Sequence, residues 1–278
     1  MHFYRMSCFC LLLLCAGPAL AAEGLRIGLT PTFLGERPAL LADWRAYLEN
    51  RLGRPVAFIL KDSHEETMEL LRQQQIQAAW LCDCPRITMN REFNLLATPL
   101  FHGRPYYRAY LVVPQADQVT HRLLDLKDKV FAYGDPTSNA GHMNPRYELW
   151  KFGVDPDHFF RRTFLTHTHG NAIEAVAAGV ADATSVNSYV WETLDQQPAL
   201  TGRTRIAARS VEYGFPPFVT THTMAPGDFR ALQRALLTMA EDARGRVVLK
   251  KMNLDGFALP QPELYQPVRE IVRYMDNR

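Results

Sequence analysis

The sequence of 278 residues predicts an α/β protein with two α/β lobes, joined by a two-strand hinge, with a ligand cleft between them. Three observations predict this fold. Short apolar segments alternate with helical segments from residue 25 to residue 81, which is typical of a mostly parallel sheet. The same alternation recurs from residue 130. A later apolar segment, 218–221, then has the character of a strand that returns to the first lobe.

The elements follow from apolar periodicity and from the residues that interrupt it. Apolar positions recur with a helical period over 37–52, whereas Pro114 and Gly179 mark the ends of elements. Strands are expected at 25–29, 56–60, 78–81, 106–113, 130–133, 182–186 and 218–221, and helices at 37–52, 67–72, 144–152, 171–178, from 187, 226–243 and 262–276. We expect residues 23–108 and 218–278 to form the first lobe and residues 109–217 to form the second.

The N-terminus has the pattern of a secretory signal peptide over residues 1–21. Arg5 precedes an apolar run, 8–16, and the small residues of Ala19-Leu20-Ala21 suit cleavage before Ala22. The run is too short to span a bilayer. We therefore expect a soluble, exported protein that is located in the periplasm.

The composition is that of a globular protein with a sizeable core, with 47 % hydrophobic and 22 % charged residues. The formal net charge of +2 gives no reason to expect a nucleic-acid partner. Only Cys82 and Cys84 remain after the predicted cleavage, so no disulfide framework is expected.

The most informative segment is 133–142, a polar loop that contains glycine and leads from a predicted strand into a predicted helix. Backbone N–H groups at the start of a helix suit a small anion. A simpler alternative is an ordinary helix cap, with Thr137 or Ser138 as the capping residue and Gly141 in the turn. The segment alone leaves both open.

The chain resembles the phosphonate and phosphite (PhnD-type) periplasmic binding proteins of ABC importers. The Gly-Asp-Pro-x-Ser-x-x-Gly loop of that family is similar to residues 134–141, and a second family pattern resembles Thr168-His169 together with Ala175, Gly179 and Asp182. The resemblance implies a type II-like periplasmic binding fold and an anion held by the loop and by the histidine. The residues that it implies for ligand binding are Thr137, Ser138, Asn139, Ala140, Gly141, His169, Tyr107, His64 and Tyr189.

Residues that differ from the family pattern narrow the range of ligands that we expect. Asn139 and Ala140 replace hydroxyl residues, and His64 occupies the position of a first-lobe tyrosine. Two acidic residues that hold the amine of aminophosphonates align with Tyr189 and about Pro216. Because a buried ammonium without a carboxylate is costly, we expect phosphite, phosphate or an amine-free phosphonate.

Cys82 and Cys84 follow the third predicted strand, at the sheet edge that faces the cleft in such a fold. They are either two small packed thiols or soft ligands for arsenite or a metal. His167 and His169 would form another pair if they lay on a strand, and His142 either reaches the cleft or faces solvent. We expect no metal and no cofactor.

The sequence favours a binding protein over an enzyme. Ser138 lies in no G-x-S-x-G motif, and no H-E-x-x-H motif is present. We expect a monomer whose partner is an ABC permease. The alternative is a sensory binding protein that engages a membrane histidine kinase or cyclase, with arsenite or a soft metal bound through Cys82 and Cys84 as a candidate ligand.

Overall fold

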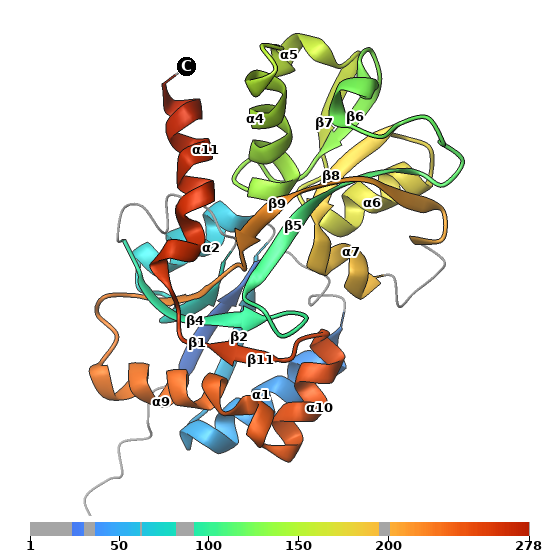
Figure 1. Ribbon diagram of the computed structural model, residues 1–278. Coiled ribbons are helices and arrows are strands. Elements are labelled where there is room, and N and C mark those ends of the chain that lie inside the picture. The colour runs from blue at the N-terminus through green and yellow to red at the C-terminus, as the bar shows by residue number, and fades with distance from the viewer. Residues whose placement is uncertain (1–23, 31–36, 62, 82–91, 195–200, 278) are drawn as a thin grey trace, which may run out of the picture.

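The computed structural model describes residues 24–30, 37–61, 63–81, 92–194 and 201–277. They form two lobes, each built on its own β-sheet with helices on both faces (Figure 1). The predicted two-lobe α/β architecture is therefore confirmed. Within these ranges, no helix has the length and apolar character needed to cross a membrane.

The first sheet has six strands in the order β11-β4-β10-β3-β1-β2. Strand β1 pairs in parallel with β2 and β3, whereas β10 runs antiparallel between β3 and β4. The bounds are β1 (Leu25–Leu29), β2 (Val56–Leu60), β3 (Ala78–Trp80), β4 (Asn94–Leu100), β10 (Phe218–Thr220) and β11 (Gly256–Ala258). The return of the chain to this sheet at residue 218 agrees with the sequence.

Helices cover both faces of the first sheet, and the two faces carry separate apolar clusters. Gly28 in β1 allows the helix on one face to approach closely, since a Cβ there would lie 2.7 Å from the Thr67 side chain. The bounds are α1 (Pro38–Leu52), α2 (His64–Arg72), α9 (Pro226–Leu237), η4 (Met239–Glu241) and α10 (Ala243–Met252). Helices α1, α9 and α10 pack on the face opposite to α2.

The second sheet has five strands in the order β7-β6-β8-β5-β9. Strand β6 pairs in parallel with β7 and β8, and β5 runs antiparallel between β8 and β9. The strands are β5 (Tyr106–Pro114), β6 (Val130–Tyr133), β7 (Arg162–Leu165), β8 (Ala183–Asn187) and β9 (Thr204–Gly214). The remaining elements are η2 (Leu123–Leu126), the π-turn η3 (Asn139–Met143), α4 (Asn144–Lys151), α5 (Pro156–Phe159), α6 (His169–Ala177), α7 (Ser188–Leu194), η5 (Pro262–Tyr265) and α11 (Gln266–Asp276).

The chain crosses between the sheets twice, from β4 to β5 and from β9 to β10 (Figure 1). The crossings lie side by side, because the Phe215 amide donates to the Pro105 carbonyl at 2.9 Å. This is the predicted two-strand hinge. The lobe boundaries at 108/109 and 217/218 stay a prediction.

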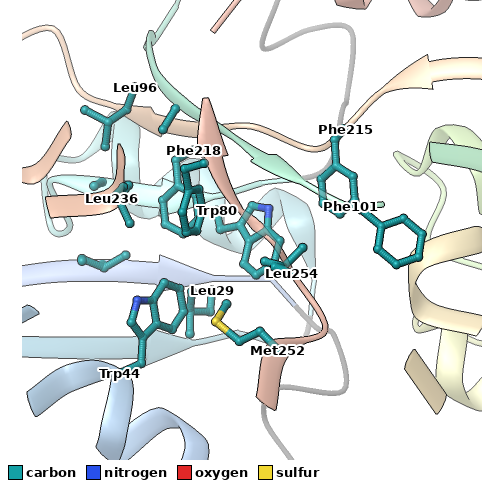
Figure 2. Packing of buried hydrophobic residues seen from close by; sticks show 14 of the residues in the cluster. Leu29, Trp44, Trp80, Leu96, Phe101, Phe215, Phe218, Leu236, Met252 and Leu254 are labelled. Carbon is teal, nitrogen blue, oxygen red and sulfur yellow. The ribbon is translucent and has the colours of Figure 1, made fainter. Parts of the chain in front are cut away.

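An aromatic cluster connects the core of the first lobe to the hinge (Figure 2). Trp80 lies 5.4 Å from Phe218 and 6.5 Å from Phe215, between ring centroids. The Phe215 ring in turn lies 5.1 Å from that of Tyr189, which belongs to α7 of the other lobe. Apolar packing therefore continues from one lobe to the other beside the hinge.

The sequence patterns do not predict β4, β7, β9 and β11. Strand β7 is largely exposed and β11 has three residues, so neither shows a clear alternation. The single helix expected over 226–243 is wrong, because Asp242 caps a new helix by accepting from the amides of Arg244 and Gly245. Helix α2 begins at His64, and the Ser63 hydroxyl caps it by accepting from the Glu66 amide.

Candidate anion-binding site

The loop after β6 is held in place by its own polar groups. Asp135 is buried, and its Oδ1 accepts from the amide of Thr137 at 2.8 Å and from its hydroxyl at 2.6 Å. The Gly134 amide donates to the Gly141 carbonyl at 2.8 Å. These bonds fix the path of the chain before the following helix begins.

Ser138 is the cap at the end of this loop. Its Oγ accepts from the Gly141 amide at 3.1 Å. A hydroxyl can accept and donate at the same time, so this bond leaves the Ser138 proton available for a ligand. The Ala140 amide, in the first turn, donates to no acceptor among the described residues. The cap and an anion seat are therefore compatible functions of one turn.

Two glycines make the turn compact. A Cβ on Gly134 would lie 3.1 Å from the Gly141 Cα. A Cβ on Gly141 would lie 3.2 Å from both His169 Cε1 and Ser138 Oγ. The close approach of the two backbones thus brings the capping serine next to a histidine of α6.

A cavity of about 50 Å³ lies between the lobes at this turn. This volume suits a small ion of a few heavy atoms, since about 10–15 Å³ on the same kind of measure already holds a water molecule. The cavity is lined by Thr30, His64, Trp80, Leu81, Tyr107, Ser138, Ala140, His169, Asn187, Tyr189, Val190, Phe215 and Pro216.

The cavity brings together six of the residues predicted to bind ligand, namely His64, Tyr107, Ser138, Ala140, His169 and Tyr189. Three others lie behind this lining. The Thr137 hydroxyl donates to Asp135, the Asn139 Nδ2 donates to Tyr107 Oη at 2.8 Å, and Gly141 supports the turn. The site assignment itself stays a prediction.

His64 and His169 approach the cavity from opposite lobes, at the starts of α2 and α6. The Nδ1 atom of each is buried and has no hydrogen-bond partner among the described residues. Burial lowers the pKa of His64, and burial together with the nearby His64 lowers the pKa of His169 to about 4; Asp135 opposes both shifts. Both imidazoles are therefore neutral at neutral pH in the ligand-free protein.

The Tyr189 hydroxyl joins the lobes. It donates to the Met252 carbonyl of α10 at 2.7 Å, so that its one proton is used away from the cavity. A second bond between the same two segments runs in the opposite direction, from Asn253 Nδ2 to Thr193 Oγ1 at 3.0 Å. The ring of Tyr189 lines the cavity, but its hydroxyl cannot donate to an anion in this arrangement.

Sequence reasoning missed several lining residues that were open to prediction. Thr30 and Leu81 follow β1 and β3, at the sheet edge where ligands bind in open α/β folds, and Trp80 ends β3. Trp80 packs in the core and also lines the cavity. No sequence pattern indicates that Phe215 lines the cavity, because its position depends on the path of the hinge.

Other residues of the sequence patterns have structural roles. Asp182 Oδ2 accepts from the Val130 amide at 2.7 Å, and Gly179 has a left-handed φ of 73° after α6. His167 does not share a strand face with His169, because β7 ends at Leu165 and His167 itself has a φ of 63°. The expectation of a histidine pair on a strand is therefore wrong.

His142 lies beside the turn and outside the cavity lining. Its ring centroid is 5.0 Å from that of Tyr133, and burial lowers its pKa to about 4, with Arg146 acting in the same direction. Cys82 and Cys84 lie outside the described residues. Within the described ranges, no group of three or more side chains could hold a metal ion.

Comparison with known families matches residues 27–265 to ABC transporter phosphonate periplasmic substrate-binding proteins. The chain belongs to this family. It is 26 % identical over 167 residues to the probable ABC transporter phosphite-binding protein PhnD1 of Prochlorococcus marinus, which covers 56 % of this chain. The chain spans about half the length of that curated relative, 54 %.

Solved structures of family members share the fold. The PhnD1 structure from Prochlorococcus marinus in complex with methylphosphonate superposes with a TM-score of 0.80 at 19 % identity, covering 92 % of this chain and 99 % of that one. A binding protein component of a Pseudomonas aeruginosa ABC phosphonate transporter gives a TM-score of 0.82 at 18 % identity, covering 91 % and 86 %. The fold is thus that of type II periplasmic binding proteins.

Proposed function

We propose that this family member is exported by its predicted signal peptide and captures a small oxyanion for an ABC importer. The candidate ligands are phosphite, phosphate and amine-free phosphonates. The observation that carries the proposal is the small cavity that Ser138 and His169 line together with His64 from the other lobe. We expect the protein to bind the ligand without making or breaking a covalent bond, and hinge closure to complete the binding site.

The composition of the cavity wall supports this ligand class. Ser138, His64 and His169 offer neutral hydrogen-bonding groups, whereas Trp80 and Phe215 form an apolar surface. Such a wall suits a ligand with oxygen atoms on one side and a hydrogen or methyl group on phosphorus on the other. No carboxylate lines the cavity among the described residues, which opposes an ammonium group.

Family membership favours import over sensing. The family is defined as the substrate-binding component of phosphonate ABC transporters, and its relatives include a probable phosphite-binding protein and a protein solved with methylphosphonate. We infer accordingly that the partner is an ABC permease and that the protein acts as a monomer in the periplasm, without enzymatic activity.

A thermal-shift panel tests the ligand class. Phosphite, phosphate and methylphosphonate are compared with aminoethylphosphonate, sulfate and arsenite, with and without reductant. We expect stabilisation by at least one of the first three and none by aminoethylphosphonate, because its ammonium would be buried without a partner. Stabilisation by aminoethylphosphonate, or by arsenite alone, would overturn the assignment.

Variants locate the site in the same assay. Ser138→Ala and His169→Ala should abolish most of the ligand-induced shift while each protein stays folded. Asp155→Ala is the matched control, because Asp155 caps α5 by accepting from the Asp157 amide and lines no part of the cavity. A full ligand response in both site variants would contradict the assignment.

A further inference from the structure

The cavity lacks a permanent positive charge among the described residues. No lysine or arginine side chain lines it, although its proposed ligands carry one or two negative charges. An anion enclosed in a small cavity without a compensating charge loses its hydration at a large cost. Among the described lining residues, the side chains that can supply a positive charge are therefore those that can gain a proton.

His64 and His169 are the groups placed to do so. Each comes from a different lobe, each lines the cavity, and each has a buried Nδ1 atom without a partner in the described parts of the chain. A neutral imidazole donates from one ring nitrogen, whereas an imidazolium donates from both. Protonation would thus give each ring a second N–H donor and a positive charge beside the cavity that both residues line.

We propose that anion binding at this site is coupled to protonation of the His64–His169 pair, which supplies the positive charge that the cavity wall lacks. This inference rests on the proposed function. The proton comes from the solvent and is bound by an imidazole nitrogen as the ligand enters, and it is released when the ligand leaves. No covalent bond to the ligand forms or breaks.

The surroundings of the pair fit this coupling. In the ligand-free protein, burial lowers the pKa of both rings, and the nearby His64 lowers the pKa of His169 further. Asp135 is the one acidic group among the described residues that acts on both, and it favours their protonated forms. The tyrosines that line the cavity, Tyr107 and Tyr189, do not supply positive charge. An anion between the rings adds to the effect of Asp135 and opposes the effect of His64 on His169.

Ligand affinity should depend on pH in a direction set by the pKa of His169 with and without ligand. The pKa of His169 is about 4 without ligand and rises when an anion binds beside it. Between the ligand-free and the bound pKa, the complex holds more protons than the free protein. Binding therefore weakens as the pH rises through this window, by about tenfold per pH unit where one proton is taken up.

Calorimetry with methylphosphonate over a series of pH values from about 5 to about 9, corrected for the titration of the free ligand, measures this directly. Titrations in two buffers with different ionisation enthalpies give the number of protons bound with each ligand. We expect uptake of about one proton per ligand, because a second imidazolium would be opposed by the first. Binding with no proton exchange would overturn the coupling while leaving the proposed function intact.

Variants decide which group takes the proton. His64→Gln and His169→Gln keep a hydrogen-bond donor but cannot titrate, so each should lower the proton uptake, whereas the exposed His121→Gln should not. Unchanged uptake in both single variants and in the double variant with His64→Gln and His169→Gln would mean that the ligand itself is protonated, which contradicts the proposal. If neither variant binds ligand, the chemical shifts of the imidazole carbons in the wild-type complex report the protonation of the two histidines. Two neutral rings in that complex would overturn the proposed coupling. Failure of the wild type to bind any oxyanion would instead refute the proposed function.

Discussion

At the scale of single residues, the site depends on side chains that serve the fold and the ligand together. Ser138 caps the helix through its oxygen and retains its proton, so the same hydroxyl can stabilise the turn and hold an anion. Thr137 lies next to it and cannot do the same, because its proton goes to Asp135. Two neighbouring hydroxyl residues of this loop therefore differ: we expect Ser138 to donate to the ligand, whereas Thr137 stabilises the loop.

Gly141→Ala should weaken ligand binding more than it weakens the fold. The new Cβ would lie 3.2 Å from both His169 Cε1 and Ser138 Oγ, so these atoms must move by a few tenths of an ångström. We expect the ligand Kd to rise roughly tenfold, since small displacements of binding groups are costly. The free energy of unfolding should fall by only about 1 kcal/mol.

Calorimetry and thermal denaturation measure the two effects. Gly227→Ala is the control, because a Cβ at Gly227 meets no atom within 4 Å, and it should change neither quantity appreciably. An unchanged Kd in Gly141→Ala would show that this turn does not touch the ligand.

At the scale of elements, the contact between α7 and α10 holds the lobes together away from the ligand. Tyr189 and Thr193 of α7 bond to Met252 and Asn253 at the end of α10. Asn253 adopts a left-handed φ of 57°, which ends α10 and directs its side chain back to the other lobe. These bonds connect the two lobes directly, and we expect them to stabilise the closed arrangement whichever ligand is bound.

Tyr189→Phe should weaken the binding of every ligand by the same factor. It removes the bond to the Met252 carbonyl, which is worth about 1 kcal/mol, or roughly fivefold in Kd. Tyr110→Phe is the matched control, because the Tyr110 hydroxyl donates to Glu192 within the second lobe and should leave affinity unchanged. The measurement is calorimetry with phosphite and methylphosphonate. A loss confined to one of the two ligands would show that the Tyr189 hydroxyl contacts it.

Most of the elements could be predicted where a single pattern governed them. The buried β6 strand, the loop after it and the return of β10 to the first sheet are examples. Strand β9 could not, because bulges at its pairing with β5 shift the register and its burial does not alternate. The hydrogen bond of the Tyr189 hydroxyl could not be predicted from the sequence either, because its acceptor is a carbonyl 63 residues away.

At the scale of the whole molecule, the two lobes form the site only together. His64 lies on the first, and Ser138 and His169 lie on the second. Phe215, labelled in Figure 2, comes from the hinge. Helix α11 adds a further contact across the molecule, because the Tyr274 ring lies 5.2 Å from that of Tyr147 in α4. A ligand held by both lobes therefore favours the closed arrangement.

A crystal structure of the protein with methylphosphonate tests the central claim most directly. The account predicts one ligand in the cavity between the lobes, with phosphonate oxygens within hydrogen-bond distance of Ser138 Oγ and the His169 ring and with the methyl group toward Trp80 or Phe215. A ligand bound elsewhere, or one that contacts neither Ser138 nor His169, would contradict it.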